Sequence, residues 1–492
     1  MEKYILSIDQ GTTSSRAILF DHNGRVCSMA QREVECLFPK PGWVEADALG
    51  IWVSVIDVVN EVLVKENVTM ESVDSIGITN QRETSIVWDK KTGLPVYHAI
   101  VWQSRQSADI CEQFEKQKDF IHERTGLLIN PYFSASKIRF ILDHIPDGQK
   151  RAEAGELMFG TVDCWIIYKM TKGKVHATDA TNASRTMLYN INENKWDDEL
   201  LKLFNIPKSM LPEVLPSSYK YGVASFFSNE VEICGVAGDQ QAALFGQTCY
   251  EVGESKNTYG TGCFMLLNTG NKPVLSKKGL LTTVAWQIGN KVTYALEGSV
   301  FVGGAVVQWL RDQMRMFRDA SESEGYALNV KDTNGMYFVP AFVGLGTPYW
   351  DDDARGAAFG MTRGTTKNHF IRACLEAIAY QCKDVFEVMK NETNCCLKSL
   401  KVDGGATRNK FLMQFQSDIL HTEIKLPMCL ETTALGAAYL AGLASGFYKD
   451  LEEIKSIHSY QAIYKPEMDE KTVEEKYNGW LKAIEATRVF RQ

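Results

Sequence analysis

The sequence has few of the features that mark secreted, membrane-bound or zinc-binding proteins. Its 492 residues include twelve scattered cysteines and no CxxC pair, so neither a zinc site nor a disulfide framework is predicted. The N-terminal residues MEKYILSIDQ lack a basic segment followed by an apolar core, and no apolar run reaches ~18 residues. We therefore expect reduced, mostly buried thiols in a cytoplasmic protein with no membrane insertion.

Positive charge is also scarce. With 53 Lys and Arg against 61 Asp and Glu, the net charge is -8, and such a field repels nucleic acid and anionic membranes. We therefore expect no nucleic-acid partner, and any anionic ligand must depend on a local site. No low-complexity linker interrupts the chain, and 45% hydrophobic residues can build the cores of two or three closely packed domains.

A hydroxyl-rich turn lies near the start of the chain. Residues 7 to 21, SIDQGTTSSRAILFD, place Gly11 and four consecutive hydroxyl residues between two apolar runs. Glycine lets the backbone bend closely, and successive N–H groups with hydroxyls can bind phosphate oxygens. Asp9, at the end of the first run, can hold Mg²⁺ directly or through water. A polar hairpin turn without a ligand is the alternative.

The first 80 residues have the pattern that opens a ribonuclease H-like domain. Residues 3 to 36 predict three strands in a meander, with a hairpin at residues 22 to 24. Asp47 is the predicted N-cap of a long helix, and residues 73 to 80 predict the next strand. Apolar residues recur at helical spacing along that helix: Leu49, Trp52, Val53, Ile56, Val59 and Val62.

The second half begins with a comparable pattern. Residues 256 to 270 predict a strand, a glycine and threonine turn at residues 260 to 262, and a second strand. Another glycine turn, Gly404 and Gly405, ends a predicted strand. Helices are predicted over residues 303 to 317, 369 to 389 and 433 to 444. Two related lobes hinged near residue 250 would bring such turns together across a cleft. None of these glycine turns has the pattern GxGxxG, so a dinucleotide-binding site is not predicted.

Two further segments place polar residues directly after a predicted buried strand. In GITNQRE, residues 77 to 83, an amide, a guanidinium and a carboxylate suit vicinal hydroxyls, although a surface ion pair is the alternative. In ICGVAGDQQAALFG, residues 233 to 246, Asp239 is either a helix N-cap or a carboxylate that takes up a proton in phosphoryl transfer. Trp102 and Tyr132 are isolated aromatics of a kind that usually belongs to the core.

A series of short motifs covers nearly the whole chain: DQGTTSSR, KPGWVE, GITNQRE, IVWQ, NPYFS, FGTVDCW, TDATNASRTML, GVAGDQQAALFGQ, NTYGTGCFM, FVPAF, GLGTPYWD and FLMQFQSDIL. Together they resemble the FGGY family of carbohydrate kinases, and within it the members that phosphorylate glycerol. The resemblance implies an α/β fold with two ribonuclease H-like (actin-like ATPase) domains flanking a cleft. It implies an N-terminal domain at residues 1–247 and a C-terminal domain at residues 248–492.

The resemblance also implies in-line transfer of the γ-phosphoryl group of ATP to a terminal hydroxyl of glycerol, with Asp239 as general base and Mg²⁺ near Asp9. The implied glycerol contacts are Arg82, Glu83, Trp102, Tyr132, Asp239, Gln240 and Phe264. The implied ATP contacts are Thr12, Thr13, Ser14, Arg16, Thr261, Gly304, Gln308, Gly405 and Asn409. A homo-oligomer, either dimer or tetramer, is implied as well.

The chain departs from the family pattern in the loop YGVASFFSNEVE, residues 221 to 232. Some relatives carry here an arginine-containing site for a sugar bisphosphate, and others a histidine that the sugar phosphotransferase system phosphorylates. This loop contains neither residue, so neither control is predicted. Phe140 and Ala358 are two further departures, and both indicate packing changes. Two alternatives stay open: an FGGY kinase of another polyol or ketose, and a non-kinase actin-like ATPase.

Overall fold

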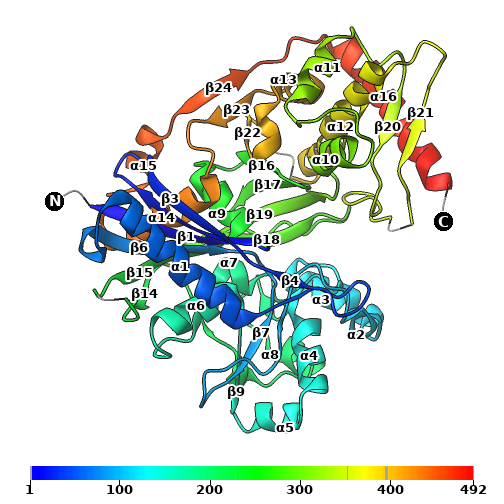
Figure 1. Cartoon of the computed structure of the whole chain (residues 1–492). Helices are drawn as coiled ribbons and strands as arrows, with labels where there is room; N and C mark the ends of the chain where they lie inside the picture. Colours follow the sequence, from blue (N-terminus) through cyan, green and yellow to red (C-terminus); the bar gives the residue numbers. More distant parts are fainter. Residues whose placement is uncertain (1–2, 228, 352, 394–396, 491–492) are drawn as a thin grey trace.

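A sheet of thirteen strands runs through the molecule (Figure 1). This computed structural model describes residues 3–227, 229–351, 353–393 and 397–490. The strands lie in the order β24-β23-β22-β16-β17-β19-β18-β14-β15-β6-β1-β2-β3. Their bounds are β1 Tyr4–Gln10, β2 Ser14–Phe20, β3 Val26–Glu33, β6 Val73–Asn80, β14 Ser218–Val223, β15 Glu232–Gly238, β16 Ser255–Tyr259, β17 Cys263–Gly270, β18 Leu281–Ile288, β19 Lys291–Val300, β22 Leu400–Asp403, β23 Ile424–Pro427 and β24 Tyr460–Tyr464.

The same strand arrangement occurs twice in this sheet. In the first half, β3, β2 and β1 are antiparallel, and β6 and β15 continue the sheet in parallel. In the second half, β19, β17 and β16 are antiparallel, and β22 and β23 continue it in parallel. The two units meet where Ser218 of β14 pairs with Ile288 of β18. This repeat confirms the predicted α/β fold class with two related units.

Helices cover both faces of the first unit. The side chains of β1 alternate between the faces. Leu6 and Ile8 pack in one cluster with helix α1 (Ala48–Glu66), whereas Ile5 packs in another with helix α14 (Thr432–Ser445). Helix α14 comes from the far end of the sequence, so the C-terminal half supplies part of the core around the first sheet.

Helix α1 confirms the predicted helix and its N-cap. The carboxylate of Asp47 accepts a hydrogen bond from the Leu49 amide at 3.0 Å. Two of the apolar residues counted in the helical pattern are nevertheless on the solvent side, since Leu49 is 36% and Val53 is 52% exposed. Trp52, Val59 and Val62 of the same pattern are buried as predicted, so the buried face of α1 is a stripe that leaves the other two residues outside.

The segment between β6 and β14 builds most of the lower part of the molecule in Figure 1. Its loops carry Trp102, Tyr132 and Arg185, which are described with the site below. Its elements are β7 Ile86–Asp89, β8 Ala99–Ile100, α2 Ala108–Glu112, α3 Lys118–Thr125, α4 Ser134–His144, α5 Gly148–Glu153, β9 Leu157–Gly160, α6 Val162–Met170, β10 Ala177–Asp179, α7 Ala180–Ala183, β11 Tyr189–Asn190, β12 Lys195–Trp196, α8 Asp198–Leu203 and β13 Glu213–Leu215.

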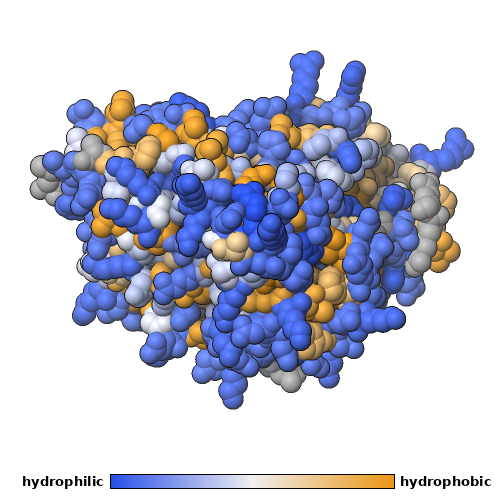
Figure 2. Space-filling view, turned by 90° about the horizontal axis from the view of Figure 1, so that it is seen from below, coloured by the Kyte–Doolittle hydropathy of each residue, from blue (hydrophilic) through white to orange (hydrophobic). Residues whose placement is uncertain are grey.

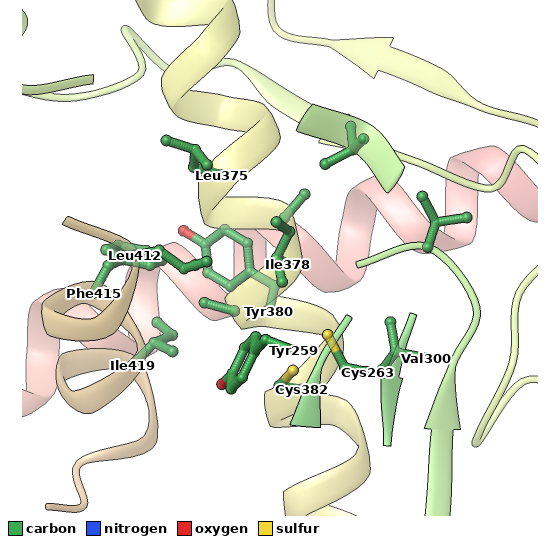
Figure 3. Packing of buried hydrophobic residues seen from close by; sticks show 14 of the residues in the cluster. Tyr259, Cys263, Val300, Leu375, Ile378, Tyr380, Cys382, Leu412, Phe415 and Ile419 are labelled. Atoms are coloured by element: carbon green, nitrogen blue, oxygen red, sulfur yellow. The ribbon is translucent and has the colours of Figure 1, made fainter. Parts of the chain in front are cut away.

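A second core lies between the sheet of the second unit and helices α12 (Lys367–Thr393) and α13 (Lys410–Leu420), as Figure 3 shows. Tyr380 of α12 lies between the sheet and Phe415 of α13. The hydroxyl of Tyr259 donates to Oε1 of Gln416 at 2.6 Å. Because Tyr259 directly precedes Gly260, this core fixes the start of the second glycine turn.

The helix predicted over residues 303 to 317 is shorter than expected, since α10 covers Ala305–Asp312. The amides of Gly303 and Gly304 instead donate to carbonyls of the second glycine turn. Beyond the helix, Arg315 has a φ of 52°, a left-handed conformation that an α-helix does not contain. The remaining helices are α9 Asp239–Gly246, α11 Glu322–Leu328, α15 Leu451–Ile457 and α16 Glu470–Val489.

The thiols are mostly inside and the surface is mostly polar. All ten cysteines in the described ranges are free and seven of them are buried, as predicted, whereas Cys395 and Cys396 lie outside these ranges. Figure 2 shows apolar side chains interspersed among polar ones on one face. Among the described helices, none combines the length and the apolar character needed to cross a membrane.

Helices α9 and α14 touch through two glycines. A Cβ on Gly436 would lie 1.8 Å from the carbonyl oxygen of Ala242, and one on Gly246 would lie 2.0 Å from that of Thr432. Real atoms never approach so closely, so only glycine permits this contact. Since α9 begins at Asp239, the contact also fixes the position of that carboxylate.

We expect Gly436→Ala to lower the free energy of unfolding by roughly 3 kcal/mol, because the methyl group forces α14 away from α9. Urea denaturation followed by circular dichroism measures this loss. Gly325→Ala in α11 is the matched control, because nothing lies within 4 Å of its added Cβ. Alanine there should leave stability unchanged or raise it slightly. Equal stabilities of the two variants would contradict the proposed close contact.

Candidate active site

Three parallel strands end at the same edge of the first sheet. Asp9 of β1 is level with Thr79 of β6, and Gly238 of β15 is level with Asn80. The residues that follow these strands therefore meet at one edge, where α/β sheets commonly bind ligands. They are the segment 81–83 after β6 and Asp239 after β15, which places the two predicted polar segments side by side.

Arg82 is buried at the centre of this edge. Its Nη1 and Nη2 atoms donate to the two carboxylate oxygens of Glu297 at 2.5 and 2.9 Å, and its Nε lies 3.2 Å from Oδ1 of Asp239. Only 3% of Arg82 is exposed, so the surface ion pair considered for this segment is excluded. Burial alone would lower the pKa of Arg82, but Glu297 and Glu83 raise it above its ordinary value, and the guanidinium stays charged.

A second buried arginine completes a network of alternating charges. Nε of Arg185 donates to Oε1 of Glu83 at 2.6 Å, and Nη2 donates to Oε1 of Glu297 at 3.1 Å. Glu297 therefore binds two arginines. Burial raises the pKa of Glu83, although Arg82 and Arg185 act in the opposite direction. Removing one member of such a network leaves an unpaired buried charge, which is costly.

Asp239 is the first residue of α9 and not its N-cap, which is Gly238. Its Oδ1 accepts from the amide of Gln240 at 2.7 Å and faces Arg82. The side chain keeps 32% of its surface exposed, in contrast to the fully buried carboxylates around it. This geometry favours the second sequence interpretation, in which the carboxylate is available to a ligand.

Aromatic rings lie beside these charges. Trp102 and Tyr132 pack edge to face with ring centroids 5.4 Å apart, and Nε1 of Trp102 donates to the Thr12 hydroxyl at 2.8 Å. This bond connects the aromatic pair to the hydroxyl-rich turn. Lys137, which is fully buried, donates to the carbonyls of Pro131 at 2.7 Å and of Tyr132, and so holds the loop that presents the tyrosine ring.

Phe264 reaches the same region from the second unit. It lies opposite Ser299 of β19 and Thr258 of β16. Opposite residues of antiparallel strands, and residues two positions apart, share a face of the sheet. Phe264 therefore shares its face with Glu297 and with Lys256.

Close backbone contacts occur within the first glycine turn and between the glycine turns of the second unit. In the first turn, the Gly11 amide donates to the Ser14 carbonyl at 2.8 Å, and Thr13 is exposed. In the second unit, the Gly304 amide donates to the Gly260 carbonyl at 2.8 Å. A Cβ on Gly404 would lie 2.5 Å from the Tyr259 carbonyl oxygen. The predicted turns of the second unit are therefore one cluster.

Other predicted nucleotide contacts are less closely connected to this cluster. Gln308 is exposed on α10. Asn409 caps α13 by accepting from the Leu412 amide at 2.9 Å, and donates to the Ser323 hydroxyl at 3.2 Å. Gly405 is exposed, and nothing lies within 4 Å of an added Cβ. The space beside it is open to a ligand.

Asp9 lies among other acids. Burial raises the pKa of Asp9 to about 7, with Arg16 acting against the rise and Asp239 and Glu431 adding to it. Arg16 itself pairs with Glu431 at 3.3 Å. Asp9, with Asp239 and Glu431 nearby, offers carboxylate oxygens of the kind that a hard divalent cation binds. Within the described ranges no three His, Cys, Asp or Glu side chains converge on one point, so phosphate oxygens and water would have to supply most of a magnesium shell.

Three members of this site had no role in the sequence interpretation: Arg185, Glu297 and Lys256. Arg185 lies within the motif TDATNASRTML, which contributed to the family resemblance, but no chemical role was predicted for this arginine. Glu297 gave a local signal, since it is the lone acid of its strand and directly follows the apolar residues Ala295 and Leu296. Lys256 opens the second glycine-turn motif and is completely buried.

Models of the FGGY family of carbohydrate kinases match most of the chain, the N-terminal domain over residues 4–246 and the C-terminal domain over residues 255–445. The chain belongs to this family. A glycerol kinase of Geobacillus sp. (strain WCH70) is 59% identical over 496 residues, with all of both chains covered. The FGGY chain described here is also similar in structure to Plasmodium falciparum glycerol kinase with ADP, at 38% identity, a TM-score of 0.93, and 99% and 98% of the two chains covered.

The FGGY fold itself extends to more distant structures. A gluconate kinase from Lactobacillus acidophilus has a TM-score of 0.88 at 22% identity, with 99% of each chain covered. This similarity supports the fold and leaves the substrate open. Membership in a family of carbohydrate kinases argues against the alternative of a non-kinase actin-like ATPase.

Proposed function

We propose that this chain phosphorylates glycerol with ATP and releases sn-glycerol 3-phosphate and ADP. The observation that carries the proposal is the edge where Arg82, Glu83 and Asp239 meet beside Trp102 and Tyr132. Glycerol has hydroxyl groups on one side and a hydrocarbon surface on the other. The charged residues can bind the hydroxyl groups, and the aromatic rings can cover the hydrocarbon surface. The full-length similarity to glycerol kinases supports the same acceptor.

In the proposed reaction, Asp239 takes the proton of the attacking hydroxyl as general base, and Arg82 orients its carboxylate from 3.2 Å away. Gln240, Glu83 and Phe264 complete the acceptor site. The backbone and hydroxyls of the first turn, Thr12, Thr13 and Ser14, with Arg16, stabilise charge on the phosphates. In the second unit, Thr261 and Gly304 of the glycine-turn cluster, with the predicted contacts Gln308, Gly405 and Asn409 outside it, hold the rest of the nucleotide.

Mg²⁺ fits this arrangement beside Asp9, where carboxylate oxygens of the preferred kind are available. When bound, the ion neutralises charge on the phosphate oxygens. We further propose domains at residues 1–247 and 248–492 and a homo-oligomer, as the resemblance implies, and a cytoplasmic location, as the scattered cysteines predict.

The direct test measures ADP release with ATP, Mg²⁺ and one acceptor at a time. We expect release to require both Mg²⁺ and glycerol, to stop on addition of a chelator, and to resume with excess Mg²⁺. Erythritol, xylulose and ribulose are longer than glycerol, and a site shaped around a three-carbon triol rejects them by steric clash, so glycerol should give the highest kcat/KM of the four. A higher kcat/KM with another acceptor would overturn the choice of glycerol.

A further inference from the structure

Lys256 is a fully buried lysine that makes its bonds across the boundary between the two units. It lies on β16, the first strand of the second unit. Its ammonium donates to Oε1 of Gln240, on α9 of the first unit, at 2.5 Å, and to the hydroxyl of Thr258 at 2.9 Å. Both partners are neutral. Among the described residues, the salt bridges within 4 Å include none to Lys256.

Burying an ammonium group without a direct carboxylate partner is expensive, so this lysine is poorly explained by stability alone. Burial lowers the pKa of Lys256 to about 8. The surrounding carboxylates Asp403, Asp239 and Glu297 act against that shift, and Arg82 adds to it. The ammonium therefore lies within the field of the site already described.

An ammonium group can only donate hydrogen bonds, and this restricts its partner. The Gln240 side chain must turn its carbonyl oxygen toward Lys256, because its NH2 group facing an ammonium would leave two donors in contact. Gln240 is only partly buried, so the other side of its amide can face a ligand. The orientation of the amide thus follows from the chemistry of its neighbour.

We propose that Lys256 is a positioning residue that turns Gln240 so that its NH2 group, and not its carbonyl oxygen, faces the bound acceptor. The neighbouring residues then offer complementary groups, since Asp239 accepts a hydrogen bond and Gln240 donates one. This pair fits one hydroxyl that gives its proton to Asp239 and a second oxygen that accepts from Gln240. The inference rests on the proposed function for the identity of the acceptor.

A double-mutant cycle between positions 256 and 240 tests this coupling. Lys256→Met should raise KM for glycerol about tenfold, the loss of one oriented hydrogen bond, with KM for ATP changed less than about twofold. In a Gln240→Ala background the same change should raise KM for glycerol less than about twofold, because residues that act as a unit are not additive. Lys256→Gln keeps an NH2 donor and should show a smaller rise in KM.

Lys401 provides a matched control. It is the register partner of Lys256 on β22 and is also buried, but it donates to the Thr248 carbonyl at 2.9 Å, away from Gln240. Lys401→Met should destabilise the protein without changing KM for glycerol. Additive effects in the cycle, or an equal rise in both KM values, would overturn the role of Lys256. If Lys256→Met fails to fold, Lys256→Gln replaces it in the cycle.

The same experiment separates failure of the coupling from failure of the proposed function. If the wild-type enzyme prefers another polyol or a ketose, glycerol is the wrong acceptor, and the cycle is run with the preferred one. Coupling between Lys256 and Gln240 then still supports the positioning role, and its absence still contradicts it.

Discussion

Replacing Asp239 with asparagine is expected to lower kcat at least ~10²-fold, because a positioned general base typically contributes ~10²–10⁴-fold. Asparagine keeps the size of the side chain and an oxygen for Arg82, which lies 3.2 Å away, but it cannot take up the proton. A coupled assay of ADP release measures kcat. Calorimetry of ADP binding should give a nearly unchanged affinity, since the glycine turns are not altered.

Asp198→Asn is a suitable control for this substitution. Asp198 is also the first residue of a helix, α8, and also pairs with a cation, Lys208, at 2.7 Å, but it is exposed and its partner is not part of the site. Its kcat should equal that of the wild type. Near-normal turnover of the Asp239→Asn variant would remove Asp239 from the role of general base.

Glu297→Ala is expected to lower the free energy of unfolding by about 3–5 kcal/mol, the usual cost of breaking a buried ion pair by removing one partner. Two buried guanidinium groups, Arg82 and Arg185, lose their shared carboxylate. Because Arg82 is then free to turn, KM for glycerol should also rise. Urea denaturation at neutral pH and steady-state kinetics measure the two effects.

Glu376→Ala separates these two effects. Glu376 is also buried, and Oε1 accepts from Nε of Arg372 at 2.9 Å, but both residues belong to α12. This variant should lose stability and keep the wild-type KM for glycerol. A Glu297→Ala variant whose KM for glycerol is unchanged would show that Glu297 does not orient Arg82 for the substrate.

The stability contributed by Glu297 should also depend on pH. Burial alone would raise its pKa, but Arg185 and Arg82 lower it from 4.5 to about 2. A carboxyl group whose pKa is lowered by folding stabilises the protein above its unfolded pKa, and this stability is lost as the pH falls from about 4.5 to about 2. The difference in stability between wild type and Glu297→Ala should therefore shrink over that interval. The raised pKa of Glu83 acts in the opposite direction, and the part of that rise that Glu297 causes is lost in the variant.

Patterns within short segments were enough to predict the fold class and several residues that the first unit contributes to the site. Strand, turn and helix signals are contained in short segments, so the hydroxyl-rich turn and the strand-end positions of Arg82 and Asp239 were visible in the sequence. Arg82 and Glu297, in contrast, are 215 positions apart, and Lys256 meets Gln240 across the unit boundary. No local pattern specifies which charges such distant strands bring together.

The details of the helices show the same dependence on distant contacts. Leu49 and Val53 fit the helical spacing, but unlike Trp52, Val59 and Val62 they lie outside the stripe of α1 that the core covers. The helix predicted over residues 303 to 317 begins two residues late, at Ala305, and ends at Asp312, before the left-handed Arg315. Periodicity indicates that a helix exists, whereas its partners decide which face is buried and where it ends.

Helix α14 has a consequence for the order in which the chain can fold during synthesis. It covers one face of β1, β6 and β15. Its backbone lies so close to Gly77 and Gly235 that a larger residue at either position would clash with it. These strands are complete at Gly238, but α14 ends only at Ser445, about 200 residues later. The emerging first half therefore presents an uncovered apolar sheet face until most of the polypeptide has left the ribosome. Its folding cannot finish domain by domain, and chaperones have a defined surface to protect during that interval.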